Sequence, residues 1–551
     1  MHAFRPTDES FCIAVLGDFL GEEASGGLTT AERWEPRRAT PETVSELLGL
    51  RPSVHLDIPG AGHALRMEFR TLDDFGPDSL FERHDAFRDL REARRALKEG
   101  EPLPPGLTGG EGLDREPGPE DDPNREPGPG ERNDRESGPE DGAGRESGSG
   151  MRGGLETDSA GARTSGTGPG LPEGADLLDA ILEGSGEEKR STDAEGITDS
   201  ERPRDPGRPT GQGPDPGRSP GRGPDPDLRR FVREIVRPHL VSPDTDREEA
   251  IAEVDRSASE MMERVLHAPG FLELEAAWRS LVFLLSRIDT SGKTRVYLVP
   301  VTRSDLADDL LSTDDPEGTR LFDLLSRPPL GAPERRWALA LGAYEFGAEP
   351  GDADLLRRIG GAARLARVPW ISGLAPESMG QGSFAGSQDG RDWPDSEPGE
   401  WRSLRASPDA PWVALAAPRF LVREPYGEEG RPVRAFDFQE SVTSRADLPW
   451  GNGAFVCGAL LGQGHARAGW SFRPSDFLEM DGLPLAPGGA AGGSPPSSLE
   501  GDFSAGAARI LADRGFVPLV SFPRQARIRV GGLRSLSADG SPLRGLWEAG
   551  A

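Results

Sequence analysis

Cysteine is almost missing from this sequence of 551 residues, which contains only Cys12 and Cys457. A disulfide framework needs several cysteines at suitable spacing, so a small disulfide-stabilised fold is excluded. Each cysteine lies inside an apolar run, where a free thiol behaves as a small buried hydrophobic group. We therefore expect both side chains to belong to a hydrophobic core.

Lysine occurs only at positions 98, 189 and 293, so arginine carries nearly all of the positive charge. Asp and Glu outnumber Lys and Arg by 94 to 64, which gives a formal net charge of -30. Proteins that bind nucleic acid or anionic membranes need clustered Lys and Arg on their surface. The charge balance therefore argues against both classes of partner.

Long apolar runs are missing as well. No stretch approaches the roughly 20 apolar residues that cross a bilayer, so no direct membrane insertion is expected. The polar opening MHAFRPTDES precedes a first apolar run, residues 11–16, that is too short for a signal-peptide core. We therefore expect the protein to be made and to work in the cytoplasm.

Sequence motifs of catalysis and metal binding are also missing. The seven histidines are scattered, without pairs three or four residues apart, which argues against a metal site. The segment Ser291-Gly-Lys-Thr294 lacks the first glycine of a phosphate-binding loop, and a turn entering a strand explains it better. Paired carboxylates at 73–74 and 308–309 lie beside predicted helix ends, where solvated acids are common. We predict a non-enzymatic protein without a cofactor or metal.

The middle of the chain, residues 101–226, differs in composition from both sides. It repeats Arg-Glu-Pro-Gly or Arg-Glu-Ser-Gly from positions 115, 125, 135 and 145, and later becomes rich in Pro, Gly, Arg and Asp. A repeat without apolar residues has no face to bury against its neighbour. We therefore predict a disordered Gly/Pro/Arg/Glu-rich linker that separates two folded regions.

One short apolar stretch interrupts this linker. A helix over residues 175–183 would place four apolar side chains on one face, namely those of Leu177, Leu178, Ile181 and Leu182. A helix this short is not stable alone in water, so it would fold on a partner. A chance cluster, or a strap on the protein's own surface, explains the pattern about as well.

The N-terminal block, residues 8–100, is predicted to be a small α/β unit. Its apolar patterns predict a strand at 11–16, a short helix from Pro41 to Leu48, and a hairpin with strands near 54–58 and 65–69. A last helix is expected from Pro77 to about Lys98. Its apolar stripe is suited to docking on another element.

The C-terminal block, residues 227–551, is predicted to be a larger α/β domain. Two long helices, around 251–265 and 271–285, precede strands at 295–301, 337–343 and 368–374. Helices lie between the strands, one of them with Ser304 as its predicted N-cap, and a helix and strand over 505–520 follow. This alternation favours a partly parallel sheet flanked by helices.

At this point the residues resemble a known family, the contractile sheath of type VI secretion systems. The segments Ala14-Val-Leu-Gly-Asp-Phe19 and Phe69-Arg-Thr-Leu-Asp-Asp-Phe75 are similar to the small sheath subunit. The segments that resemble the large subunit are Val265-Leu-His-Ala-Pro-Gly-Phe271, Leu274-Glu-Ala-Ala-Trp-Arg-Ser-Leu281, Tyr344-Glu-Phe346, Pro418-Arg-Phe-Leu-Val-Arg-Glu-Pro-Tyr-Gly427, Trp450-Gly-Asn-Gly-Ala-Phe455 and Gly515-Phe-Val-Pro-Leu519. The order along the chain indicates a small subunit fused to a large one.

The resemblance implies a structural protein that assembles with other sheath subunits around an inner tube and drives the tube outward by contraction. It also implies contacts with a baseplate and recognition of the 175–183 helix by a Clp-type recycling ATPase. An alternative function is a non-polymerising adaptor that binds sheath or baseplate subunits, because both ends of the chain are shorter than the resemblance leads us to expect.

Overall fold

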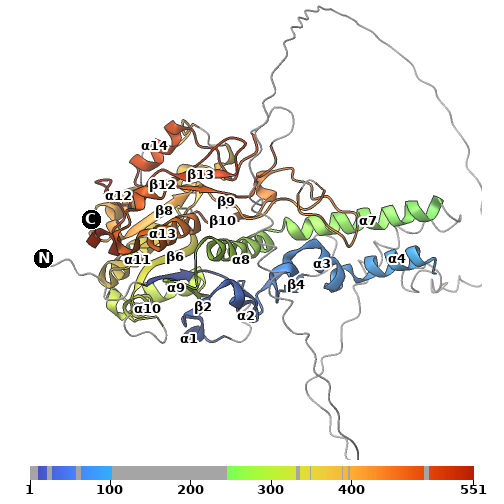
Figure 1. Ribbon diagram of the computed structural model, residues 1–551, viewed down its shortest axis with the longest axis horizontal. Helices are drawn as coiled ribbons and strands as arrows, with labels where there is room; N and C mark the ends of the chain where they lie inside the picture. Colours follow the sequence, from blue (N-terminus) through green and yellow to red (C-terminus); the bar gives the residue numbers. More distant parts are fainter. Residues whose placement is uncertain are drawn as a thin grey trace, which may run out of the picture. The chain divides into compact units, whose positions relative to one another are not determined.

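The computed structural model describes ten stretches of the chain, on which every structural statement below depends (Figure 1). They are residues 10–21, 28–57, 64–101, 245–329, 335–347, 349–386, 389–394, 398–428, 430–488 and 495–550. Apart from residue 101, the predicted linker 101–226 lies outside the described residues, as does its predicted helix 175–183.

The N-terminal block contains the predicted strand, short helix and paired strands. Its elements are β1 (Phe11–Leu16), α1 (Thr30–Arg33), β2 (Arg37–Ala39), α2 (Val44–Leu48), β3 (Ser53–Leu56), β4 (Leu65–Glu68), α3 (Pro77–Arg83) and α4 (Arg88–Glu99). A 3-10 turn over Pro41–Thr43 precedes α2, and the Thr40 side chain accepts the backbone N–H of Thr43 at 3.3 Å. Thr40 therefore caps the start of the predicted short helix.

The single helix predicted from Pro77 to Lys98 is wrong, because the chain breaks it at His84. That residue is extended, with φ -82° and ψ 137°, and its Nδ1 accepts the backbone N–H of Ala86 at 3.2 Å. The imidazole thus caps a new 3-10 turn, Asp85–Phe87, which leads directly into α4. The break directs α4 away from the line of α3.

The C-terminal block contains the two predicted long helices and alternates strands with helices afterwards. Its helices are α7 (Thr245–Leu266), α8 (Pro269–Arg287), α9 (Arg303–Leu311), α10 (Arg320–Ser326), α11 (Asp352–Ala366), α12 (Gly399–Arg405), α13 (Ala454–Ala468) and α14 (Ala505–Asp513). Its strands are β5 (Thr294–Val299), β6 (Trp337–Phe346), β7 (Trp370–Leu374), β8 (Val413–Ala417), β9 (Phe420–Leu421), β10 (Trp450–Gly451), β11 (Glu479–Asp481), β12 (Val517–Ser521) and β13 (Arg527–Val530).

Two details of this block correct the sequence prediction. Helix α9 is capped by Thr302 and not by Ser304, because the Thr302 hydroxyl accepts the Asp305 N–H at 3.0 Å. Helix α13 was not predicted from the sequence at all. At Gly458, an added Cβ would lie only 2.6 Å from the side chain of Leu341 of β6. The helix therefore packs very closely on the sheet.

Nine strands form one sheet in the order β11-β13-β12-β8-β7-β6-β1-β5-β2. The strands from β5 to β12 in this order all run parallel to their neighbours. β2 and β13 are antiparallel to theirs, and β11 pairs antiparallel with β13. The fold is therefore α/β with a mostly parallel sheet and flanking helices, as the sequence predicted.

Both faces of this sheet are covered. Along β1, Phe11, Ile13 and Val15 belong to one hydrophobic core, while Cys12, Ala14 and Leu16 belong to the other. The first core also contains residues of α8 and α13, and the second contains residues of α9, α10 and α11. Because parallel strands are covered on both faces, they appear as continuous apolar runs, as residues 11–16 do.

Within the described parts of the chain, no helix combines the length and apolar character needed to cross a lipid bilayer.

Candidate functional site

The most extensive functional feature is the internal contact between residues 11–101 and residues 245–550, called the seam below. β1 pairs in parallel with β5 on one side and with β6 on the other. All six of its residues are buried. A strand from the start of the chain therefore completes a sheet made by the C-terminal block, which the sequence alone did not predict.

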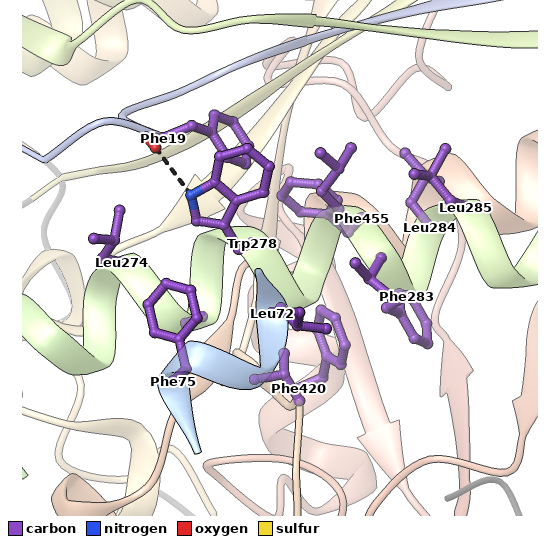
Figure 2. Packing of buried hydrophobic residues seen from close by; sticks show 14 of the residues in the cluster. Phe19, Leu72, Phe75, Leu274, Trp278, Phe283, Leu284, Leu285, Phe420 and Phe455 are labelled. Carbon is purple, nitrogen blue, oxygen red and sulfur yellow. Dashed lines mark hydrogen bonds between the residues drawn. The ribbon is translucent and has the colours of Figure 1, made fainter. Parts of the chain in front are cut away.

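Aromatic side chains pack on both sides of the seam, close to α8. Phe69 and Phe75 stack with ring centroids 4.0 Å apart, and Phe271 of α8 meets both rings edge-on at 5.8 and 5.7 Å. Farther along α8, the buried Trp278 donates its indole N–H to the backbone oxygen of Phe19 at 2.9 Å (Figure 2). These contacts bury large apolar surfaces and leave the indole N–H satisfied.

The helices α4 and α7 continue the seam away from the sheet, where they lie side by side (Figure 1). Arg94 of α4 makes two hydrogen bonds to the carboxylate of Asp255, at 2.5 and 3.2 Å. Arg247 donates to the backbone oxygens of Leu97 and Lys98 at the end of α4. Of the predicted apolar stripe, Leu90 is buried and Leu97 is partly buried against the core, and Ala93 and Ala96 of the same helix are buried beside them.

A third part of the seam involves the loop that follows β9. The carboxylate of Asp78 accepts the backbone N–H groups of Arg434 and Ala435, both at 2.8 Å. Phe81 stacks on Phe436 with centroids 4.6 Å apart. These contacts attach α3 to a loop whose own position depends on a buried ion cluster.

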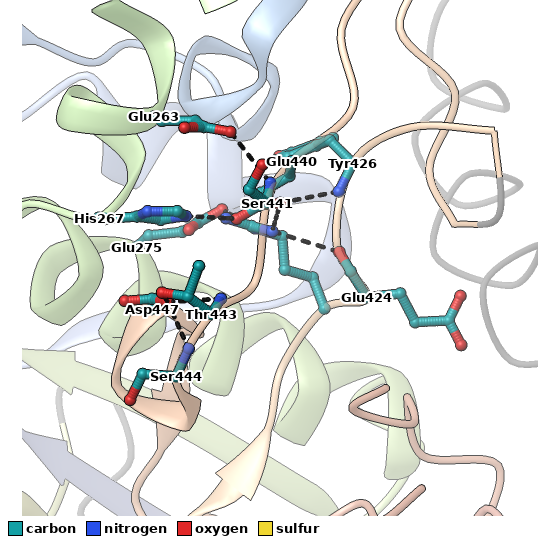
Figure 3. Close-up of polar contacts among 11 residues, drawn as sticks. Glu263, His267, Glu275, Glu424, Tyr426, Glu440, Ser441, Thr443, Ser444 and Asp447 are labelled. Carbon is teal, nitrogen blue, oxygen red and sulfur yellow. Dashed lines mark hydrogen bonds and ion pairs between the residues drawn. The ribbon is translucent and has the colours of Figure 1, made fainter. Parts of the chain in front are cut away.

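That cluster consists of Glu275 and Arg279 of α8 with Arg423, Tyr426 and Glu440 of the loop. Figure 3 shows Glu275, Tyr426 and Glu440 close together. Arg423 donates to Glu275 and to Glu440, with both distances 2.8 Å and all three side chains buried. Glu440 also accepts the backbone N–H of Tyr426 at 2.7 Å. The loop is therefore held to α8 by charges that have no access to water.

Electrostatics within the cluster favours its charged form. Burial raises the pKa of Glu440, but the guanidinium of Arg423 together with hydrogen bonds from His267 and the Tyr426 N–H outweighs that effect and lowers the pKa to about 2. Burial lowers the pKa of Arg423, and the carboxylates of Glu275 and Glu440 more than offset it and raise that pKa. Removing one member would leave an opposite charge buried without its partner, which is costly.

Other polar residues singled out in the sequence have structural roles. Asp74 accepts the N–H groups of Arg70 and Thr71, and Asp309 accepts that of Arg320, so one carboxylate of each pair binds backbone N–H groups. Asp289 holds the turn through the Ser291 N–H, and the chain then enters β5. The described residues contain no group of three His, Cys, Asp or Glu side chains placed to hold a metal ion.

The four apolar residues proposed as a partner-binding face, Leu177, Leu178, Ile181 and Leu182, lie outside the described residues. The ion cluster, in contrast, was not predicted. A charged residue within the apolar run 420–423 was the only local signal for it. The partners of Arg423 are 148 and 17 residues away in the sequence, so spacing could not reveal them.

Comparisons with known proteins agree with this architecture. The family described as VipB: EvpB/VC_A0108, tail sheath N-terminal domain, matches residues 248–536, which is just over half of the chain. The chain is also similar to the type VI secretion system sheath protein TssC1 of Pseudomonas aeruginosa, with 28% identity over 291 residues. That alignment covers 50% of this chain and 58% of the relative. With the match reaching from the start of α7 to the strands that end the sheet, the chain belongs to the VipB family of type VI secretion sheath proteins.

Proposed function

We propose that this chain is a fused protomer of a type VI contractile sheath, in which residues 8–100 replace the small subunit and residues 227–551 form the large one. The observation that carries the proposal is the position of β1. A small block that merely bound at the surface would leave its strand at an edge, whereas β1 lies between β5 and β6. The family match supports the large-subunit part only.

In this proposal the chain has a structural role and no catalytic one. Its protomers associate with one another in the cytoplasm, around an inner tube and on a baseplate, and contraction moves the tube. Force of this kind comes from switching between two packings of the same interfaces. Seam contacts as extensive as those of β1, α4 and Phe69 would keep each protomer intact while its outer contacts change.

Electron microscopy of the purified full chain, alone and with candidate tube proteins, tests the proposal. We expect long hollow filaments when a cognate tube protein is present. Discrete particles that bind authentic sheath or baseplate subunits without polymerising would contradict it and would support an adaptor function instead. A variant with Ile13→Asp in the middle of β1 should form no filaments, because a carboxylate would be buried without a partner.

We also propose that residues 175–183 bind a Clp-type ATPase, with Leu177, Leu178, Ile181 and Leu182 as anchors of a helix in a groove. The variant Leu178→Asp/Ile181→Asp should lose binding to the cognate ATPase and keep filament formation. A matched control is Leu171→Asp/Ile197→Asp, which introduces the same charges into the same stretch. Unchanged binding of the first variant, or equal loss in both, would refute the assignment.

A further inference from the structure

An open groove of about 640 Å³ follows one side of α7, and residues 437–441 form its opposite wall. Its lining is strongly acidic, with the carboxylates of Glu248, Asp255, Glu260, Glu263 and Asp437 against the single guanidinium of Arg256. Ile251 and Ala252 add an apolar strip near the start of the helix. The groove therefore suits an occupant with both positive charge and apolar side chains.

Among these acids, Asp255 and Glu263 have strong partners, whereas Glu248 and Glu260 do not. Asp255 is paired with Arg94, and Glu263 accepts the backbone N–H of Ser441 at 3.1 Å. Glu260 lies 3.8 Å from the largely exposed Arg264, and Glu248 has no partner among the residues that the structure describes. The negative charge of Glu248 thus has no described partner, and that of Glu260 is compensated only by a long ion pair at a solvent-exposed position.

The chain itself contains a segment of matching character directly before α7. Residues 228–240, Leu-Arg-Arg-Phe-Val-Arg-Glu-Ile-Val-Arg-Pro-His-Leu, lie outside the described residues. The segment contains four arginines and one glutamate, and Arg229, Arg233 and Arg237 recur every fourth residue. Phe231, Val232, Ile235 and Val236 recur at the spacing of a helical face. We propose that residues 228–240 occupy the groove, with residues 228–237 as a helix antiparallel to α7 that ends before Pro238.

Length and connection agree with this arrangement. Residues 238–244 then connect this helix to α7, a length within the usual range of helix–helix connections. At the rise of an α-helix, residues 228–237 would extend about 15 Å, which fits within the roughly 22 Å of groove from Glu248 to Glu263. With Arg237 near Glu248, the antiparallel direction places Arg229 beside Arg256 and one helical turn before Glu260, which a long arginine side chain can reach. Because the segment is tethered at the groove, its effective concentration there is high.

Charge also distinguishes residues 228–240 from the other short apolar stretch, residues 175–183, as a candidate for the groove. Residues 175–183 carry Asp176, Asp179 and Glu183 and no basic side chain, so the acidic groove repels them. The inference is independent of the proposed sheath function, since it concerns only how the chain packs on itself.

Hydrogen–deuterium exchange of the full chain, read by mass spectrometry on residues 228–240, tests the proposal. We expect the amides of this segment to exchange at least about tenfold more slowly than in a free peptide of the same sequence. Glu248→Arg/Glu260→Arg should remove the protection. Glu249→Arg/Glu99→Arg makes the same change in net charge at exposed positions outside the groove and should preserve it. High salt should weaken the protection in the wild-type chain.

A charge swap makes the test specific. Arg229→Glu/Arg237→Glu alone should lose protection, and combining it with Glu248→Arg/Glu260→Arg should restore it. The segment variant leaves every described residue unchanged, so it tests the proposal even where the groove variant does not fold. Protection that persists in the groove variant, or no protection in the wild-type chain, overturns the proposal. If an added arginine-rich peptide instead protects α7 while the wild-type segment is unprotected, the groove belongs to a basic segment of another protein.

Discussion

At the scale of single residues, the molecule places its strongest polar interactions where water is absent. The guanidinium of Arg423 contacts two carboxylates, and no atom of its side chain is exposed. Such a cluster adds little stability compared with apolar packing, but its parts depend strongly on one another. The ion pairs that position the loop against α3 therefore form and break together.

We predict that Glu440→Gln destabilises the protein by about 3–5 kcal/mol, because it leaves Arg423 buried with an incomplete set of carboxylates. The measurement is urea unfolding followed by intrinsic fluorescence, and the transition of the variant should shift to lower urea. Glu428→Gln, at an exposed position of the same loop, is the control and should change stability by less than about 0.5 kcal/mol. Equal midpoints for the two variants would show that the cluster does not hold the loop.

The pH dependence of the same comparison follows from the lowered pKa of Glu440. A carboxyl group whose pKa falls on folding stabilises the protein above its unfolded pKa, here 4.5, and this contribution is lost as the pH falls toward about 2. The unfolding free energy of the wild-type chain should therefore approach that of Glu440→Gln as the pH falls through this range. Unfolding free energies measured from pH 7 down to pH 3 check this, and a gap that widens on acidification would contradict it.

At the scale of helices and strands, the sequence revealed local structure well and pairing poorly. The apolar run at 11–16 predicted β1 correctly, because buried parallel strands are apolar on both faces. No local sequence pattern indicates that β5 and β6 are the neighbours of β1, because their residues lie about 280 or more positions later in the sequence. The helix break at His84 depends on an imidazole that caps the next turn, a role that histidine rarely signals in sequence.

Helix α13 escaped prediction for a related reason. It is buried on nearly all sides and contains Gly458, Gly462 and Gly464, which lower helix propensity. Those glycines make physical sense only when the sheet and the other neighbours of α13 are in place. A side chain at Gly458 would meet Leu341, and one at Gly462 would meet Ile288.

We predict that Gly458→Ala destabilises the protein by about 1–3 kcal/mol, because the new methyl group would lie 2.6 Å from Leu341. The matched control is Gly506→Ala in α14, where the nearest atom to an added Cβ is 3.5 Å away. That change should be neutral or stabilise by up to about 1 kcal/mol, as alanine favours a helix. Thermal unfolding midpoints of both variants and of the wild-type chain test this prediction. A Gly458→Ala variant with a higher midpoint than wild type would show that α13 is not packed so closely.

At the scale of the whole molecule, the seam makes the two blocks dependent on each other. Inserting a protease site near Gly150 and cutting there should give two pieces that co-elute in size-exclusion chromatography and separate only in denaturant. The reason is that β1 is hydrogen-bonded on both sides and fully buried. The uncut chain with the same insertion is the control for elution volume. Two pieces that elute separately without denaturant would refute the fused-protomer proposal.

The position of β1 has a further consequence for synthesis. The strand leaves the ribosome first, yet its two neighbours are complete only when Phe346, the last residue of β6, has been made. At about 5–20 residues per second, that interval is roughly 15–70 seconds. During this time Phe11, Ile13 and the aromatic residues that will meet α8 have no native surface to cover them. Newborn chains are thus most exposed to aggregation and chaperone capture before β6 emerges, and slower translation of the intervening residues lengthens that period in direct proportion.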